Sequence, residues 1–246
     1  MNKYIGKIII SSLFLFAFLI VTFGQEPKDT EDWSVKPEVI TPGKKALAPS
    51  DAIVLFDGTD FSNWSGMKGP VQWKLKGKAM EVVKGTGIIK TNQSFGSIQL
   101  HIEWRTPKKV VGESQGRGNS GIFLMGLYEV QVLDSYENES YYNGQAGSIY
   151  KQHIPLVNAC LPPGKWQSYD IVFNAPVFNE DESLKTPGYV TVIHNGVLIQ
   201  NNVELKGPTM FIGTPEYKFH ESKLPLTLQD HGNPIQYKNI WVRELE

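Results

Sequence analysis

The 246-residue sequence has a single cysteine and almost no net charge. One cysteine cannot close a disulfide within the chain, so the fold must be held together by its apolar core. Lys and Arg number 24 against 25 Asp and Glu, which leaves a formal charge of -1. Binding to nucleic acid requires a clustered excess of basic residues, so the composition speaks against a nucleic-acid partner.

Long hydrophobic runs are absent once the N-terminus has been passed. Lys3 and Lys7 precede an apolar run over 8–23, and Gly24 follows it. The run is shorter than the roughly 20 residues that a membrane-spanning helix needs. This pattern predicts a signal peptide over 1–24. We expect a secreted or periplasmic protein without stable membrane insertion after cleavage, and an uncleaved N-terminal anchor is the alternative.

The next segment, 25–50, is rich in proline and has little periodicity. It is predicted to be an extended leader that either lies on the domain or is loose. From residue 51 onward there is no linker, repeat or low-complexity stretch. We therefore expect one domain over 51–246.

No window of 12 or more residues carries a helical apolar stripe, whereas strand patterns recur along the domain. In 97–105 the residues Ile98, Leu100, Ile102 and Trp104 alternate strictly with polar ones, which is typical of a strand buried on one face. Further strands are expected over 120–125, 128–133, 166–174, 189–194, 197–202 and 236–244. Asn195-Gly196 predicts a hairpin turn between two of them. The chain is predicted to be all-β, and a sandwich is favoured over a barrel because several strands are apolar on one face only.

Several polar residues are not explained by the strand pattern. Glu103 and Arg105 on one strand, and Glu129 and Gln131 on another, are expected to share one sheet face. Asp134 lies five residues after Glu129, so only a bulge or strand end near Leu133 would bring it to the same side. The alternative is a solvated face with cross-strand ion pairs.

Other candidate site residues lie outside these two strands. Asn119 lies in a segment with three glycines, 116–121, where a ligand can approach the backbone closely. His231 is a candidate acid, base or metal ligand, or else a residue that braces a loop. Tyr150 is a candidate for contact with a sugar, whereas Cys160 has no base near it in sequence and is expected to be a packed thiol. No metal-ligand spacing is present, so a divalent cation is left open.

Five motifs, in this order, carry a family resemblance: 51–58 with Trp64, 101–105, 118–123, 129–136 and 229–234. With them the sequence resembles the 3-keto-disaccharide hydrolase family from about Asp51 to Leu245. The resemblance implies a concanavalin A-like jelly-roll β-sandwich with its site on a concave face. It also implies that the protein acts on 3-keto-glycosides.

The spacing Glu129-x-Gln131-x-x-Asp134 is similar to the Glu-x-Asp-x-x-Glu motif of endo-β-glucanases that share this fold. In that motif the outer pair are nucleophile and acid, about 5 Å apart in a retaining enzyme. Here the middle acid is Gln131 and the last acid is the shorter Asp134, which weakens a double-displacement mechanism.

A ketone at C3 acidifies the hydrogen at C2, so the glycosidic bond can break by elimination and water can then add back. This reaction requires a base, an electrophilic group at the C3 oxygen and an acid for the leaving oxygen. We expect Glu129 or His231 as the base, and Arg105, Asn119 or a divalent cation as the electrophile. Asp134 is expected to assist the leaving group, while Glu103 and Gln131 orient the sugar. A hydrolase of unoxidised β-glucan and a non-catalytic carbohydrate-binding module remain as alternatives.

Overall fold

The computed structural model describes residues 26–245, so the expected signal peptide lies outside the described residues. Residues 26–39 belong to a separate unit, in which one 3-10 turn is formed and all side chains are exposed. The compact unit that begins at Ile40 holds all the strands described below. Over 26–245, no helix has the length and apolarity required to cross a membrane.

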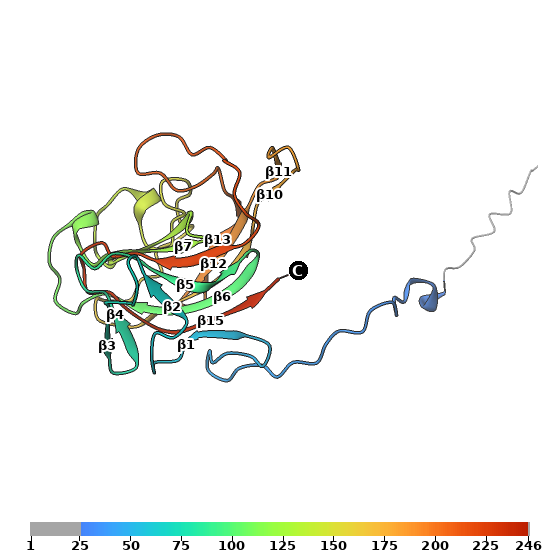
Figure 1. The fold of residues 1–246 in the computed structure, drawn as a ribbon, viewed down its shortest axis with the longest axis horizontal. Helices are drawn as coiled ribbons and strands as arrows, with labels where there is room; N and C mark the ends of the chain where they lie inside the picture. The colour runs from blue at the N-terminus through green and yellow to red at the C-terminus, as the bar shows by residue number, and fades with distance from the viewer. Residues whose placement is uncertain (1–25, 246) are drawn as a thin grey trace, which may run out of the picture. The chain divides into compact units, whose positions relative to one another are not determined.

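The strands form two main antiparallel sheets and a small hairpin (Figure 1). The eight-stranded sheet contains β13 (Val197–Glu204), β12 (Tyr189–His194), β9 (Gln167–Asn174), β6 (Ile98–Arg105), β15 (Gln236–Glu244), β4 (Ala79–Glu81) and β3 (Lys74–Lys76), with β1 (Ile53–Phe56) also paired to β15. The five-stranded sheet contains β2 (Trp64–Gly66), β5 (Ile89–Phe95), β14 (Leu224–Leu228), β7 (Asn119–Leu124) and β8 (Tyr128–Leu133). The hairpin is β10 (Val177–Phe178) with β11 (Leu184–Thr186), and the 3-10 turns are η1 (Pro27–Thr30), η2 (Ser114–Gly116) and η3 (Tyr142–Gly144).

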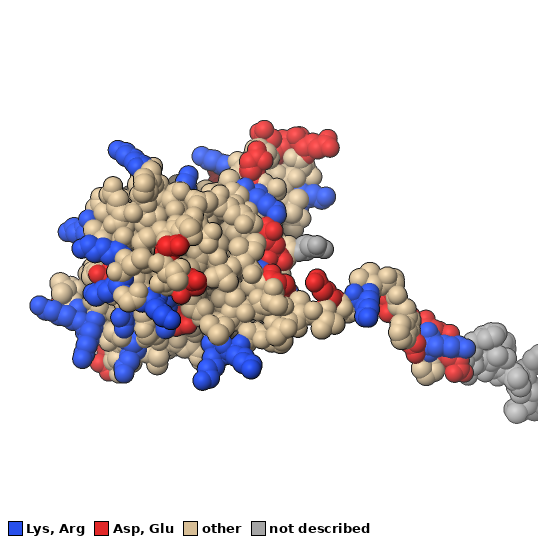
Figure 2. All heavy atoms as spheres, turned by 60° about the horizontal axis from the view of Figure 1, so that its bottom comes forward, with Lys and Arg blue, Asp and Glu red and all other residues tan. Residues whose placement is uncertain are grey.

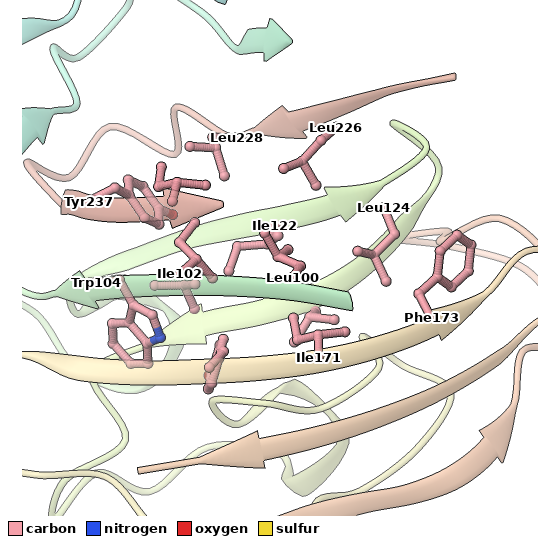
Figure 3. Close-up of a cluster of buried hydrophobic side chains, with 14 of the residues drawn as sticks. Leu100, Ile102, Trp104, Ile122, Leu124, Ile171, Phe173, Leu226, Leu228 and Tyr237 are labelled. Carbon is pink, nitrogen blue, oxygen red and sulfur yellow. The ribbon is translucent and has the colours of Figure 1, made fainter. Parts of the chain in front are cut away.

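The apolar core lies between the two sheets. Figure 3 shows side chains of β6 and β9 meeting those of β7 and β14, with Tyr237 of β15 beside them. On β6 the residues that the period-two pattern predicted to face the core are buried, Leu100 and Ile102 completely, and the intervening His101 is buried as well. Alternation places every second residue of a strand on the face away from this core. The all-β, jelly-roll sandwich architecture of the concanavalin A type is thereby confirmed, and the Asn195-Gly196 turn has the positive φ angles of 52° and 81° that its type requires.

The edge strand β8 is covered by the segment 147–150. The backbone N–H groups of Gly147 and Tyr150 donate to the carbonyls of Gln131 and Glu129, and Gln131 donates to the carbonyl of Ser148. An exposed edge would leave these groups unpaired. The pairing fixes Tyr150 beside Glu129, which matters for the site.

Part of the predicted leader lies on the large sheet. The carbonyl of Ala46 accepts hydrogen bonds from the side chains of Asn239 and Trp241 on β15, at 2.9 and 3.0 Å. The backbone N–H of Ser50 donates to the carbonyl of Thr41 and closes this segment on itself. Residues 41–50 therefore form a loop that is anchored to the outer face of β15.

Candidate functional site

A cleft of about 880 Å³ lies over the outer face of β7 and β8. Its floor includes Asn119 and Phe123 from β7 and Glu129 and Gln131 from β8, whose neighbours in sequence point into the core. Its walls come from three segments that are far apart in the chain: 113–116, 141–150 and 209–211. Gln229 and His231 complete the lining.

Glu129 is the buried carboxyl of this cleft. It is only 5 % exposed, and over the described residues its carboxylate has no ion-pair partner. Burial raises the pKa of Glu129 from its ordinary value of 4.5 to about 8. The backbone N–H of Glu129 donates to Thr209 Oγ1 at 2.9 Å, so the 209–211 wall is tied to this residue. A carboxyl of this pKa can accept or release a proton near neutral pH.

Gly121 makes room for this carboxylate. On the neighbouring strand, a Cβ atom at position 121 would collide with Glu129 Oε1 and with the ring of Phe123. Any side chain there would displace the carboxylate. The three-glycine segment of the sequence thus matters to the site. Gly121, however, makes room for the side chain of Glu129, whereas the sequence suggested close approach of a ligand.

A chain of amides lies beside Glu129. Gln131 Nε2 donates to Gln115 Oε1 at 3.0 Å, and Gln115 Nε2 donates to Ser140 Oγ at 2.6 Å. Asn119 Nδ2 donates to the carbonyl of Gln115 at 2.9 Å. The Oε1 atoms of Gln131 and Gln229 are buried without a hydrogen-bond partner in the described part of the chain. Buried acceptors of this kind need a donor, and the hydroxyl groups of a sugar can supply it.

Two tyrosine hydroxyls meet in the cleft. Tyr150 Oη and Tyr141 Oη are 2.5 Å apart, and the two rings pack edge to face. The ammonium of Lys151 lies 5.6 Å from the centroid of the Tyr141 ring, 5.8 Å from that of Tyr150 and 4.4 Å from that of Phe211. It also donates to the carbonyl of Phe211 at 2.7 Å. Burial, the bond to Tyr141 and the charge of Glu129 all raise the pKa of Tyr150, which keeps its hydroxyl protonated.

His231 is exposed and lines the open side of the cleft. Its neighbour Asp230 points elsewhere, as expected for adjacent residues. Asp230 Oδ2 accepts from the backbone N–H groups of Gly85 and Gly87, and Oδ1 accepts from that of Gly232. Bracing of the loop is therefore done by Asp230, and the imidazole of His231 is left facing the cleft.

The expected position of Asp134 is wrong. The ladder between β7 and β8 has no register shift, and the N–H of Asp134 continues it by donating to the carbonyl of Gly118. Without a bulge, the side chain lies on the side opposite Glu129, where its Oδ2 is 2.6 Å from Arg117 Nη2. Burial raises the pKa of Asp134 and the Arg117 charge opposes that rise. Asp134 does not line the Glu129 cleft.

Arg105 and Glu103 are also misplaced by the prediction, because β6 and β8 belong to different sheets. Both residues lie on the outer face of the eight-stranded sheet, with the core between them and Glu129. Arg105 stacks on Trp166 at 4.6 Å and donates to Gln236, while Glu103 pairs with Lys238 at 3.0 Å. Figure 2 brings the side of β1 and β3 forward and shows acidic and basic side chains lying next to one another there. The alternative of a cross-strand ion pair is correct for Glu103, with Lys238 as the partner and not Arg105 or Arg117. Arg105 has no ion-pair partner among the described residues.

The structure thus brings together Glu129, Gln131, Asn119, Tyr150 and His231 from the predicted set. It adds Gln115, Tyr141, Thr209, Phe211 and Gln229, which the sequence analysis missed. These residues lie in turns and connecting segments without periodicity. Only the cluster of aromatic and amide residues around Tyr141 gave a compositional signal.

Two further expectations concern the metal and the thiol. Within 26–245 there is no group of three or more His, Cys, Asp or Glu residues that could hold a metal ion. Cys160 is a free cysteine, and burial raises the pKa of its thiol to about 12, so it is a packed thiol and not a thiolate nucleophile.

Comparison with known proteins identifies the family. The model of the 3-keto-alpha-glucoside-1,2-lyase-like domain matches residues 51–243. The chain belongs to this family. The 3-keto-glucoside lyase-like domain therefore covers both sheets, from β1 to β15, and includes every predicted site residue. Among curated proteins no sequence matches the chain.

Solved structures have a similar fold. A "putative glycosyl hydrolase" from Parabacteroides distasonis ATCC 8503 is 50 % identical, with a TM-score of 0.87 over 91 % of this chain and 98 % of that one. A second protein of that description from the same organism is 20 % identical, with a TM-score of 0.57 over 80 % of this chain and 94 % of that one. The first similarity supports a glycosidase-type activity for the family, whereas the second supports the fold alone.

Proposed function

We propose that the protein cleaves the glycosidic bond of 3-keto-glycosides by abstraction of the C2 hydrogen, elimination and hydration. The observation that carries this proposal is the buried, unpaired carboxyl of Glu129 on the floor of the cleft, with a pKa raised to about 8. The family match and the glycosyl hydrolase description of the 50 % identical protein support the substrate class.

Glu129 is assigned as the base. A carboxylate of ordinary pKa is a weak base toward a hydrogen next to a ketone, and burial strengthens it by disfavouring the charged form. Proton removal from C2 places negative charge on the C3 oxygen. Donors that point into the cleft would stabilise that charge. Arg105 lies on the other sheet, so Asn119 and a divalent cation remain from the expected electrophiles.

Sugar hydroxyls have natural partners in this cleft. The unpaired Oε1 atoms of Gln131 and Gln229 accept from hydroxyls, and Phe211, 70 % exposed at the rim, offers a surface for a pyranose ring. His231 lies at the open side, where it can exchange protons with solvent during hydration of the intermediate.

Hydrolysis of unoxidised β-glucan by double displacement is less well supported. That mechanism uses two carboxyls about 5 Å apart. Among the described residues that line the cleft, the carboxylates are Glu129 and the exposed Glu113. Asp134, the second member of the glucanase-like motif, faces away and is paired with Arg117.

The test is incubation of the mature protein with a 3-keto-disaccharide in D₂O, followed by NMR with and without a chelator. We expect release of both sugars and deuterium at C2 of the keto sugar. Loss of turnover with the chelator and its return with added divalent metal would assign the electrophile at the C3 oxygen to a cation. Cleavage without deuterium at C2, or binding without cleavage, would contradict the elimination mechanism.

Secretion remains part of the proposal. We expect the exported protein to begin at Gln25, because the residues before it have the pattern of a signal peptide. N-terminal sequencing of protein from the periplasm and from the medium checks the cleavage position and the compartment.

A further inference from the structure

The relocation of Asp134 leaves the proposed reaction without the acid expected for the leaving oxygen. The carboxyl is held by Arg117 on the side of β8 away from the cleft. A glycosidic oxygen leaves as an alkoxide unless a donor protonates it as the bond breaks. The cleft must therefore supply another donor for substrates with a poor leaving group.

The hydroxyl pair of Tyr150 and Tyr141 is a buried donor in the cleft beside Glu129. Tyr150 is only 9 % exposed and lines the cleft, and its backbone N–H donates to the carbonyl of Glu129. The pairing of 147–150 with the edge of β8 thus places Tyr150 directly beside Glu129, the proposed base. The 2.5 Å separation of the two hydroxyl oxygens lets a proton pass between them or a charge be shared.

Lys151 supports this pair electrostatically. Its ammonium lies within 6 Å of the centroids of both tyrosine rings, and the bond to the carbonyl of Phe211 holds it there. A nearby positive charge stabilises a phenolate while it exists. The exposed Tyr142, by contrast, lies on the far side of the same segment, among the residues that line a separate hollow.

We propose that Tyr150, hydrogen-bonded to Tyr141, is the acid that protonates the departing glycosidic oxygen. This inference rests on the proposed function. Glu129 takes the C2 proton, and the electrons of the C–H bond form an enolate on the C3 oxygen. Collapse of the enolate forms the C1–C2 double bond and breaks the C1–O bond, whose electron pair leaves on the oxygen of the aglycone. That oxygen takes the proton of Tyr150, and Tyr141 donates a hydrogen bond to the phenolate.

Hydration then restores both groups. The oxygen of a water molecule bonds to C1 and one of its protons returns to Tyr150. Glu129, whose proton exchanges with solvent while the intermediate is bound, gives a proton to C2. The products are the free 3-keto sugar and the alcohol, and neither residue is consumed.

The experiment compares two 3-keto-glucosides, one with an alkyl aglycone and one with a 4-nitrophenyl aglycone, which leaves without protonation. Tyr150→Phe removes one oxygen atom from a buried ring. We expect it to slow release of the alkyl alcohol about 100-fold and release of 4-nitrophenol less than about 10-fold. Deuterium exchange at C2 should continue, because Glu129 is retained. Tyr141→Phe should act in the same direction and more weakly, and Tyr142→Phe should match the wild type.

The outcomes separate this inference from the proposed function. If the wild type neither exchanges C2–H nor releases either aglycone, the proposed function fails. If the wild type is active and Tyr150→Phe slows both substrates equally, leaves both unchanged or abolishes C2 exchange, then Tyr150 is not the acid and the proposed function stands. Thermal melting of each variant checks folding, and Tyr141→Phe decides the question if Tyr150→Phe does not fold.

Discussion

The outer face of each sheet carries a partly or fully buried glutamate, and the pKa values of the two glutamates are shifted in opposite directions. On the five-stranded sheet, burial without a partner raises the pKa of Glu129 to about 8. On the eight-stranded sheet, burial also opposes ionisation of Glu103, but contacts with His101, Asn239 and Lys238 outweigh it and lower its pKa to about 2. A partnered carboxylate stabilises a sheet face, whereas an unpartnered one is costly and reactive. The difference locates the candidate chemistry on the five-stranded sheet.

The largest expected effect comes from Glu129→Gln. It removes the base and keeps the shape of the side chain, so turnover of a 3-keto-glucoside should fall by about 1,000-fold or more. Glu103→Gln is the matched variant on the opposite face, and it should keep turnover within about threefold of the wild type. Initial rates measured by NMR check both. Equal losses in the two variants would show that the comparison between the faces is wrong.

Gly121→Ala is expected to act next most strongly. The new Cβ would meet Glu129 Oε1 and the Phe123 ring, so the carboxylate must move. Misplacement of a catalytic group by about 1 Å can cost about 100-fold in rate. Kinetics together with thermal melting check this, because a mere loss of folded protein would lower activity and melting temperature together. A folded variant with an unchanged rate would show that the position of Glu129 is not critical.

The pH dependence of stability should distinguish the two faces as well. Because the folded-state pKa of Glu129 is raised from 4.5 to about 8, the folded protein is destabilised progressively as pH rises from 4.5 to 8. Glu129→Gln removes that penalty. Its gain in free energy of unfolding over the wild type should therefore be larger at pH 8 than at pH 5, by a few kcal/mol at most. Urea unfolding at the two pH values measures this. A stabilisation that is the same at both would contradict the raised pKa.

The smallest expected effect concerns His101 on the large sheet. Burial opposes its charge, but Asp170, with its Oδ1 2.6 Å from Nδ1, and Glu103 raise its pKa to about 9. A raised histidine pKa contributes stability that is complete below 6.5 and lost as pH rises through 9. Asp170 is 42 % exposed, so solvent screens this pair and Asp170→Asn should cost about 1 kcal/mol at pH 6. Urea unfolding across this pH range measures the difference in free energy of unfolding between Asp170→Asn and the wild type. The difference should shrink above pH 9, and a constant difference would argue against a charged His101.

The sequence predicts the long strands of this fold because alternation is a local property. The expected strands over 97–105, 128–133 and 236–244 agree with β6, β8 and β15 within a residue. Several shorter strands were not predicted. Among them, strands β2, β3 and β4 have three residues each, too few to show a period, and β14 contains Pro225, which is unfavourable in a strand.

The site was predictable in part for the same reason. Glu129 and Gln131 are two residues apart, so one strand suffices to place them together. The sequence of a single strand does not reveal which sheet the strand joins. The prediction that Glu103 and Arg105 share a face with Glu129 was therefore wrong. Tyr141, Lys151 and Phe211 meet through the side chain of Lys151, and Phe211 lies 60 residues from it in the chain, which no local pattern reveals.

The central place of β15 in the large sheet sets an order on biosynthesis. This strand, formed by residues 236–244, pairs with β1, β4 and β6, and β1 has it as its partner strand in the sheet. Residues 53–56 and 79–81 therefore wait for a partner that is translated more than 150 residues later. Pairing over such a separation is slow because a long loop must close first. Until β15 has been made, these strands keep unpaired edges, and unpaired strand edges favour aggregation of the growing chain.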